Sequence, residues 1–141
     1  MITWIKSFFN DSGLAEFDIS LHQLDGHRAI IQGSQKSFPL VPAVLIENAI
    51  KYGLPGSRVE ISVIAKGNLA ELTIRNESES FIDCERCFDR GSRYSAKVEG
   101  GGFGLYLAKQ VVEAHKGTIG CRTTGKFVYM TVRLPLFDLM R

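Results

Sequence analysis

Residues 41–52 read VPAVLIENAIKY, and this stretch is the strongest helix pattern in the chain. Its apolar residues recur at the spacing of one helix face, as Val41, Leu45, Ala49 and Tyr52. Ile46 and Ile50 add apolar surface on a second side, so that only Glu47, Asn48 and Lys51 form a polar stripe. We therefore expect a largely buried helix whose polar edge faces a cleft.

Alternating apolar residues predict strands before and after this helix. Residues 17–21 and 29–31 are separated by a turn pair and predict one hairpin. Residues 59–63 and 70–75 alternate in the same way around the turn at residues 66–68, and they predict a second hairpin.

The second half of the chain begins with an irregular stretch, residues 76–102, which has a short helical candidate at 85–88. An irregular segment of this length inside a compact domain is typical of a functional lid, which we place at 81–101. A second helix is predicted from Gly104 to a stop at Gly117. Two last strands are predicted at 118–123 and 127–134, and the whole order favours an α+β fold with helices over a mostly antiparallel sheet.

Length and composition limit the classes of protein that the chain can represent. With 141 residues it has room for one domain, expected at 15–141 after a lead-in at 1–14. A net charge of +2 gives no argument for a nucleic-acid partner. Three cysteines do not suit a disulfide framework, and no apolar stretch is long enough to insert in a membrane, so we expect a cytoplasmic location.

Asn48 and Lys51 are the first candidate functional pair. They lie about one turn apart on the polar stripe of the first helix, where the amide oxygen can face a metal ion and the ammonium can face phosphate. The alternative is structural: Glu47 and Lys51 pair across one turn, while Asn48 caps a neighbouring group. Taken alone, the pattern favours this structural alternative.

A glycine-rich sequence, Gly100-Gly101-Gly102-Phe103-Gly104, leads directly into the second helix. Glycines allow a close approach of the backbone to a ligand, and the free N–H groups of a helix start favour phosphate. Just before it, Arg90 and Arg93 lie in a stretch from which two guanidinium groups can reach a polyphosphate. A flexible loop and a solvated basic loop are the respective structural alternatives.

These three motifs, in this order and spacing, resemble the catalytic ATP-binding domain of sensor histidine kinases. Residues 46–52 are similar to the N box of that family, 88–93 to the F box and lid, and 100–105 with 111–117 to the G2 box. The wider superfamily includes gyrase, the mismatch-repair ATPases and the heat-shock chaperone ATPases. The resemblance covers about residues 15–135.

The resemblance implies a two-layer α/β sandwich of the Bergerat type, with a mixed, mostly antiparallel five-stranded sheet under three helices. It also implies ATP and Mg²⁺ as cofactors, with Asn48 as the metal ligand and with Lys51 and Arg90 near the phosphates. The remaining implied nucleotide contacts are Tyr52, Asn76, Arg93, Gly100, Gly102, Phe103, Gly104 and Leu105. Glu47 is an implied base or supporting partner.

The sequence departs from the family pattern in the segment that follows the second hairpin. Where the family has Asp-x-Gly-x-Gly, this chain has Asn76-Glu77-Ser78-Glu79-Ser80. An Asn oxygen can still accept a hydrogen bond from the adenine amino group, although a neutral acceptor forms a weaker bond than a carboxylate. Serine in place of glycine is unfavourable wherever the turn needs a positive φ.

Two absences indicate phosphotransfer to a separate partner. Val44 occupies the position where gyrase-like relatives carry a general-base Glu, which argues against autonomous hydrolysis. The three histidines, His22, His27 and His115, lie outside any acceptor-type helix and are predicted to be structural. The resemblance therefore implies a histidine phosphoacceptor and dimerisation domain as partner, and indirectly a response regulator.

Other interpretations remain open at this stage. A degenerate docking module that keeps the fold without turnover fits the serines, and an anti-sigma-type serine kinase belongs to the same superfamily. Cys84-Glu85-Arg86-Cys87 is a C-x-x-C sequence, but zinc needs two further ligands, and the setting is not that of a thioredoxin-like motif. A metal or redox role for these cysteines is the minor alternative.

Overall fold

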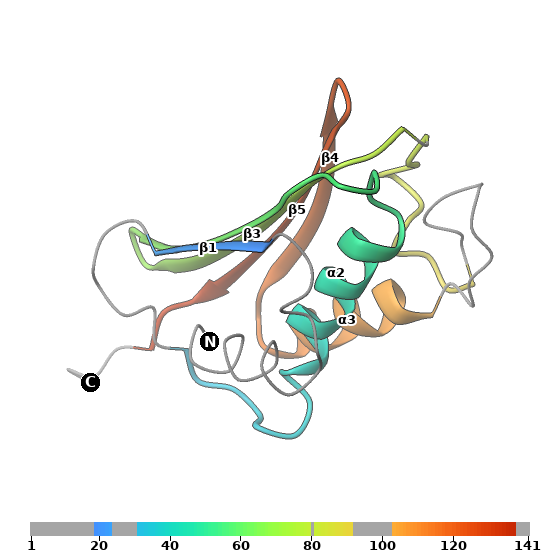
Figure 1. Ribbon diagram of the computed structural model, residues 1–141. Coiled ribbons are helices and arrows are strands. Elements are labelled where there is room, and N and C mark those ends of the chain that lie inside the picture. The colour runs from blue at the N-terminus through green and yellow to red at the C-terminus, as the bar shows by residue number, and fades with distance from the viewer. Residues whose placement is uncertain (1–18, 24–30, 80, 92–102, 138–141) are drawn as a thin grey trace.

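The computed structural model describes residues 19–23, 31–79, 81–91 and 103–137 (Figure 1). Its strands and helices follow one another as β1 (Ile19–Gln23), α2 (Leu40–Lys51), β2 (Val59–Lys66), β3 (Leu69–Glu77), α3 (Gly104–Ala114), β4 (Thr118–Thr124) and β5 (Phe127–Pro135). Helices α2 and α3 lie together on one side of the sheet (Figure 1). The predicted α+β class with two layers is therefore confirmed.

The sheet has five strands in the order β1-β2-β3-β5-β4. Strand β1 runs parallel to β2, and the other neighbours are antiparallel, so the sheet is mixed and mostly antiparallel. The predicted hairpin of β2 and β3 is present, with Ile61 opposite Ile74 and Val63 opposite Leu72. Gly67 takes a positive φ of 60° in its turn, which glycine adopts without strain.

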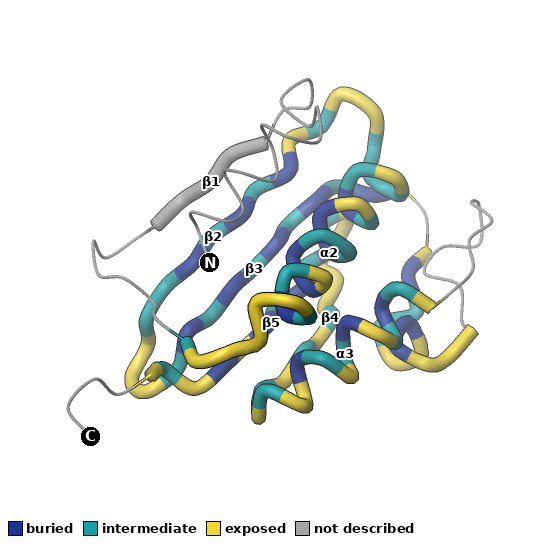
Figure 2. Tube along the Cα trace, turned by 90° about the horizontal axis from the view of Figure 1, so that it is seen from below, coloured by how far each residue is buried: buried dark blue, intermediate teal, exposed yellow. Residues whose placement is uncertain are grey.

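Alternation along the strands places one face of the sheet against the helices. In β3 every second residue is buried, and Figure 2 shows dark buried stretches alternating along β2 and β3 beneath α2. The buried members of the central strands include Ile61, Val63, Leu72, Ile74, Met130 and Val132. The opposite face carries polar pairs such as the ion pair of Arg75 and Glu60, in which Nη2 of Arg75 lies 2.8 Å from Oε2 of Glu60. Burial of the apolar row is the main force holding helices to sheet.

Helix α2 matches its prediction closely. It begins at Leu40, one residue before the predicted start, and ends at Lys51 with Tyr52 as C-cap. Its buried residues are Val41, Pro42, Leu45, Ile46 and Ala49, which include three of the four residues assigned to the first apolar face. The polar stripe is also where it was expected, because Glu47 and Lys51 are exposed.

Helix α3 buries a narrower stripe than the sequence suggests. Leu105, Ala108 and Val112 are buried as predicted, whereas Leu107 on the neighbouring row is 46% exposed. Lys116, with a φ of 61°, is the left-handed residue that follows the helix. Gly117 is needed for space instead, since a Cβ there would lie 2.5 Å from the carbonyl oxygen of Arg133.

Three expected elements differ from the structure. Strand β1 pairs with β2, and Ile31, the only described residue of the stretch expected at 29–31, lies in no strand, while the rest of that stretch lies outside the described residues. The described ranges contain two helices, so the expected count of three is not reached there. Residues 84–88 form a turn instead of a short helix. Asp83 explains this, because its side chain accepts from the N–H groups of Glu85 and Arg86 and closes a single turn.

The described part of the predicted lid, residues 81–91, is attached to the core by three of its side chains, while most of its other residues are exposed. Ile82, Cys87 and Phe88 are all buried there. Cys84 forms a disulfide with Cys121 of β4, with a Cα–Cα distance of 5.1 Å. The expectation from the number of cysteines was wrong for this pair, because two half-buried side chains distant in sequence meet where the segment crosses the sheet edge.

Within these ranges the longest helix has 12 residues, and the structure holds no helix long and apolar enough to span a bilayer. The lead-in at 1–14 lies outside the described residues. So do His27 and Ser80.

Candidate functional site

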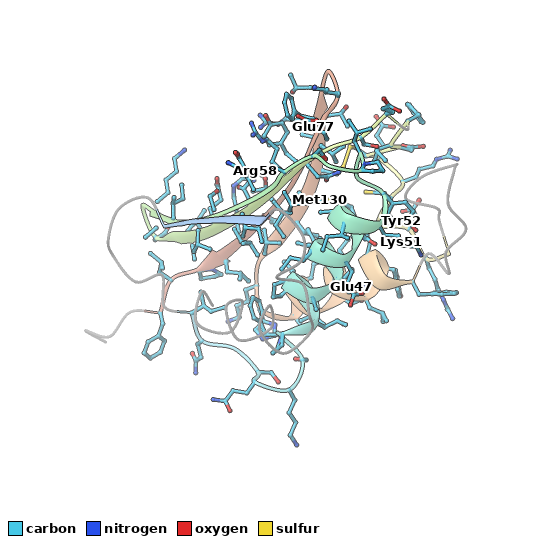
Figure 3. All side chains as sticks on the ribbon, in the orientation of Figure 1. Glu47, Lys51, Tyr52, Arg58, Glu77 and Met130 are labelled. Atoms are coloured by element: carbon cyan, nitrogen blue, oxygen red, sulfur yellow. A yellow bond between two sulfur atoms is a disulfide. The ribbon has the colours of Figure 1, made fainter. Side chains whose placement is uncertain are left out.

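The polar edge of α2 contains side chains that form no hydrogen bond or ion pair with the part of the chain that the structure describes. Asn48 is half-buried, and its side chain makes no hydrogen bond to any residue that the structure describes. Glu47 and Lys51 form no ion pair within these ranges. The Nζ of Lys51 instead lies 5.3 Å from the centroid of the Tyr52 ring, and both side chains project from the end of α2 in Figure 3. The structural alternative for this stripe is thus not what the chain forms.

The end of β3 supplies a buried amide next to the end of α2. Asn76 is 2% exposed, and its Nδ2 lies 3.5 Å from where a Cβ on Gly53 would stand. This Nδ2 donates to the carbonyl oxygen of Glu77 at 3.3 Å. The Oδ1 of Asn76 accepts no hydrogen bond from the described residues. A buried acceptor without a partner is costly, and it marks a place where a ligand donor would be accommodated.

Ser78 holds these two ends together. Its N–H donates to the carbonyl oxygen of Lys126 at 2.8 Å, and its Oγ donates to that of Tyr52 at 3.3 Å. The N–H of Leu54 also donates to the Glu77 oxygen at 2.7 Å. Ser78 does not have a positive φ, so the strain expected from replacing glycine does not arise at this position. The serine therefore fixes the strand end against the C-cap of α2.

The start of α3 lies against the middle of α2. A Cβ on Gly104 would stand 3.3 Å from Cγ1 of Val44, one turn before Asn48 on the same helix face. The N–H of Leu107 makes the first helical hydrogen bond, to Phe103 at 2.9 Å, and the cap has no side-chain acceptor. The N–H groups before Leu107 thus have no acceptor within the helix and carry the positive end of its dipole.

A cationic side chain from segment 81–91 lies beside this helix start. The guanidinium carbon of Arg90 is 5.9 Å from the ring centroid of Phe103, the N-cap residue of α3. Both residues are exposed. The contact is within the range of a cation–π interaction, which is weak at an exposed site. It places a positive charge where the free N–H groups begin.

The predicted site residues fall into three groups. Asn48, Lys51 and Tyr52 come from α2, Asn76 from β3, and Arg90, Phe103 and Gly104 meet at the start of α3. Leu105 is buried in the core, so only its backbone can serve a ligand. Arg93, Gly100 and Gly102 lie outside the described residues. Glu47 is exposed on the neighbouring side of α2.

Sequence reasoning missed the supports of this arrangement. It treated serine in place of glycine at Ser78 as unfavourable, although Ser78, together with Gly53, fixes the junction of α2 and β3. A hydrogen bond between residues 26 positions apart cannot be predicted from a local sequence pattern. The close fit of Gly104 on Val44 was equally hidden, because it depends on the crossing of two helices.

One thiol near the site has a strongly shifted pKa. Burial, together with the negative charge of neighbouring Asp83, raises the pKa of Cys87 from its ordinary value of 9.0 to about 12. Cys87 therefore stays a neutral thiol at physiological pH. Among the described side chains, no group of three His, Cys, Asp or Glu gathers as a metal cluster. A metal held by one amide and by ligand oxygens would leave no such cluster.

A separate pocket of about 760 Å³ lies at the other end of α3, between residues 31–34, 114–116 and 134–137. His115 lines this pocket, and its ring links the backbone at Ser34 to the backbone of α3 at Val111. Its Nε2 accepts from the N–H of Ser34 at 3.0 Å, so Nδ1 carries the proton donated to the Val111 oxygen, 2.7 Å away. This confirms the prediction that His115 is structural.

The fold places two helices on one face of a mixed, mostly antiparallel sheet, and this two-layer architecture defines the class of protein. The chain belongs to the family of histidine kinase-, DNA gyrase B- and HSP90-like ATPases, whose model matches residues 35–138. Membership in this family implies nucleotide use. The resemblance inferred from the three motifs is thereby confirmed.

Individual relatives agree with this assignment. The probable sensor kinase SilS of Salmonella typhimurium is 29% identical over 141 residues, which cover 96% of this chain and 28% of SilS. The sensor protein DltS of Streptococcus agalactiae is 30% identical over 113 residues, covering 75% of this chain and 28% of DltS. The chain thus spans less than a third of the length of these relatives.

Solved structures show the same fold. The solved chain of the mycobacterial sensor histidine kinase MprB superimposes with a TM-score of 0.78 at 20% identity, covering 99% of this chain and 96% of the solved chain. The catalytic domain of the histidine kinase ThkA gives a TM-score of 0.80 at 15% identity, covering 96% and 92%. At these identities the comparison concerns the fold alone.

Proposed function

We propose that this chain is the catalytic ATP-binding domain of a sensor histidine kinase. In this proposal it binds Mg-ATP between the ends of α2 and α3 and transfers the γ-phosphoryl group to a histidine on a separate dimerisation and phosphoacceptor domain. The observation that carries the proposal is the buried Oδ1 of Asn76, which lacks a partner in the described structure, on a residue that lies next to Gly53 just after the end of α2.

The residues at the site fit the chemistry of this nucleotide. The adenine amino group is a donor of the kind that the Asn76 oxygen lacks. The ammonium of Lys51 and the guanidinium of Arg90 are not engaged in ion pairs within the described ranges, so both can face phosphate. The Asn48 amide offers a hard oxygen of the type that Mg²⁺ prefers.

Catalysis by such a site is positioning combined with electrostatics. When bound, Mg²⁺ supplies charge neutralisation on the phosphate oxygens. The chain's own contribution is to orient: Ser78 and Gly53 fix the adenine end, and the contact of Gly104 with Val44 fixes the phosphate end. The free N–H groups at the start of α3 stabilise negative charge without needing a proton transfer.

The proposed reaction is phosphotransfer rather than autonomous hydrolysis. Val44 occupies the helix face toward Gly104 and offers no proton acceptor there. The acceptor histidine would come from a partner domain, since the one histidine side chain that the structure describes, His115, is engaged in the scaffold. A response regulator would receive the phosphoryl group afterwards. We place this domain in the cytoplasm, where ATP is available.

Calorimetric titration with Mg-ATP tests the proposal. We expect the parent chain to bind, and Asn48→Ala to weaken binding by about tenfold or more because the metal loses its protein ligand. Asn68→Ala is the matched control, since Asn68 is exposed in the β2–β3 turn and far from α2. No binding by the parent, or equal binding by Asn48→Ala, would remove the proposed mechanism.

A second assay separates the kinase from a docking module or a serine kinase. The chain is mixed with a histidine phosphoacceptor domain and radiolabelled ATP. We expect a phosphorylated partner whose label is lost in acid, as phosphohistidine requires. A label stable in acid would indicate a serine kinase, and binding without any transfer would indicate a docking module.

A further inference from the structure

Two of the three cysteines connect segment 81–91 to the edge of the sheet. Cys84 begins the capped turn of that segment, and Cys121 lies on β4, the strand at the end of the sheet order. The Cα–Cα distance of 5.1 Å lies within the normal range for a disulfide. The bond is thus compatible with the backbone of both segments.

The position of this bond links it to the candidate site. Segment 81–91 contacts the start of α3 through Arg90, whose guanidinium lies over Phe103. It also contacts the side of α3 through Phe88, whose ring centroid is 6.0 Å from Nζ of Lys109. The disulfide is the one covalent attachment of this segment among the described residues, and only six positions separate Cys84 from Arg90.

The chemistry of the three cysteines suits reversible oxidation of one pair. Cys84 and Cys121 are half-buried, so thiol reagents can reach them. Cys87 is buried, its thiol lies 3.7 Å from the carbonyl oxygen of Cys84, and its raised pKa keeps it protonated. Because the thiolate is the attacking species, Cys87 is a poor competitor for either sulfur. The pairing of Cys84 with Cys121 is thereby selected.

We propose that Cys84 and Cys121 form a reversible redox modification site, whose disulfide fixes segment 81–91 on β4 and holds Arg90 beside the start of α3. In a reducing compartment such a bond is transient and responds to oxidants. The two thiols lose two protons and two electrons. A small-molecule disulfide takes these up in two steps. One cysteine attacks it, which forms a mixed disulfide and releases the first small-molecule thiol, and the other cysteine then attacks the mixed disulfide and releases the second.

The consequence for nucleotide binding rests on the proposed function. A segment already fixed by the disulfide loses less conformational entropy when Arg90 engages phosphate. The oxidised chain is therefore expected to bind Mg-ATP more tightly than the reduced chain, by about fivefold or more.

The test begins with the folded parent chain, treated either with oxidised glutathione or with a reducing phosphine. Peptide mass spectrometry identifies the linked cysteines, and hydrogen exchange measures the amides of residues 83–91. We expect a Cys84–Cys121 link and exchange about tenfold slower in the oxidised form. If no such link forms in the folded chain, or if exchange is equal in both forms, the proposal is overturned.

Variants separate the bond from general effects of oxidation. Cys84→Ser and Cys121→Ser are each expected to behave as the reduced parent under both treatments. Cys87→Ala is the matched control in the same segment and is expected to keep the difference. If a serine variant fails to fold, the two forms of the parent chain still decide the outcome.

Nucleotide titration then distinguishes the two proposals. Slower exchange combined with equal Mg-ATP affinity would overturn the link between the disulfide and Arg90, while leaving nucleotide binding intact. If neither redox form binds Mg-ATP, the proposed function fails, and the exchange data alone decide whether the bond fixes the segment.

Discussion

Helices α2 and α3 cover the same face of the sheet, but they are held there very differently. Helix α2 buries five residues over twelve, and after Leu40 at its start its exposed residues are Glu47 and Lys51 on the polar edge. Helix α3 buries three residues over eleven, and Leu107 lies 46% exposed on its outer side. Helix α2 is thus packed against the core over most of its length, whereas helix α3 contacts the core along one narrow stripe.

This difference in burial predicts that the two helices position their parts of the candidate site with different rigidity. Asn48 and Lys51 project from the helix with the larger buried surface, so their backbone positions are fixed by the core itself. The phosphate end depends on the start of α3, which is positioned by a close contact with Val44 and by segment 81–91. We infer that the α2 side is the rigid part of the site and the α3 side the adjustable part.

The largest expected effect comes from matched truncations in the two helices. Leu45→Ala in α2 should lower the free energy of unfolding by about 3–5 kcal/mol, because Leu45 is 1% exposed and surrounded by the core. Leu105→Ala at the start of α3 should cost less, about 2–3 kcal/mol, since a helix end can relax into the space. Urea denaturation monitored by circular dichroism measures both.

Leu107→Ala is the control for this pair, because a half-exposed leucine should cost no more than about 0.5–1 kcal/mol. If Leu45→Ala and Leu105→Ala lower the free energy of unfolding equally, the proposed difference in packing between α2 and α3 is contradicted.

A pH dependence tests how firmly segment 81–91 is packed beside α3. Burial raises the pKa of Cys87 to about 12 from an ordinary value of 9.0, so the folded chain keeps a proton that the unfolded chain loses in this range. Its contribution to stability is fully present below pH 9.0 and declines by about 1.4 kcal/mol per pH unit as the pH rises toward 12.

Denaturation at several pH values up to about 10.5 should show this slope in the parent and a smaller one in Cys87→Ala. The difference between the two isolates Cys87 from lysines and tyrosines that titrate in the same range. Identical slopes would mean that the thiol is exposed and that the segment is not packed.

A smaller effect is expected at the contact between the two helices. Gly104→Ala places a methyl group 3.3 Å from Val44, so the start of α3 must shift by a few tenths of an ångström. Stability should change by less than about 1 kcal/mol, while Mg-ATP binding should weaken by about threefold to tenfold. The double variant Gly104→Ala with Val44→Ala should recover most of the affinity, as measured by calorimetry.

If the double variant binds no better than Gly104→Ala alone, the Val44 contact does not position α3. The double-mutant cycle therefore measures how strongly the contact between Gly104 and Val44 positions the start of α3.

The sequence predicted most of the scaffold, because periodic burial is a local property. The stripe of α2, the hairpin of β2 and β3 and the start of α3 could all be read from the spacing of apolar residues. The parallel pairing of β1 with β2 could not, since it joins segments that are separated by a helix and compete with a nearer apolar run at 29–31. The single turn at 84–88 depends on one side-chain acceptor, Asp83, which outweighed the apolar spacing.

The candidate site was predictable in its parts but not in its supports. Motif order predicted Asn48, Lys51 and Arg90 as metal and phosphate contacts, and their role stays a prediction. The hydrogen bond from Ser78 to Tyr52 and the bond from Cys84 to Cys121 join positions 26 and 37 residues apart. Contacts of this kind follow from the folded arrangement and leave no local trace in the sequence.

The most direct test of the account is a paired measurement on Asn76→Leu, a substitution of similar shape. The substitution removes the Oδ1 that lacks a partner, while the carbonyl oxygen of Glu77 keeps the hydrogen bond that it accepts from the N–H of Leu54. The free energy of unfolding should therefore be about 1–2 kcal/mol higher than in the parent. The same variant should lose at least about tenfold in Mg-ATP affinity, because the adenine donor would face an apolar group.

Opposite changes in stability and binding are the predicted result. A variant that binds Mg-ATP as tightly as the parent would show that Asn76 is not part of a nucleotide site and would contradict the account.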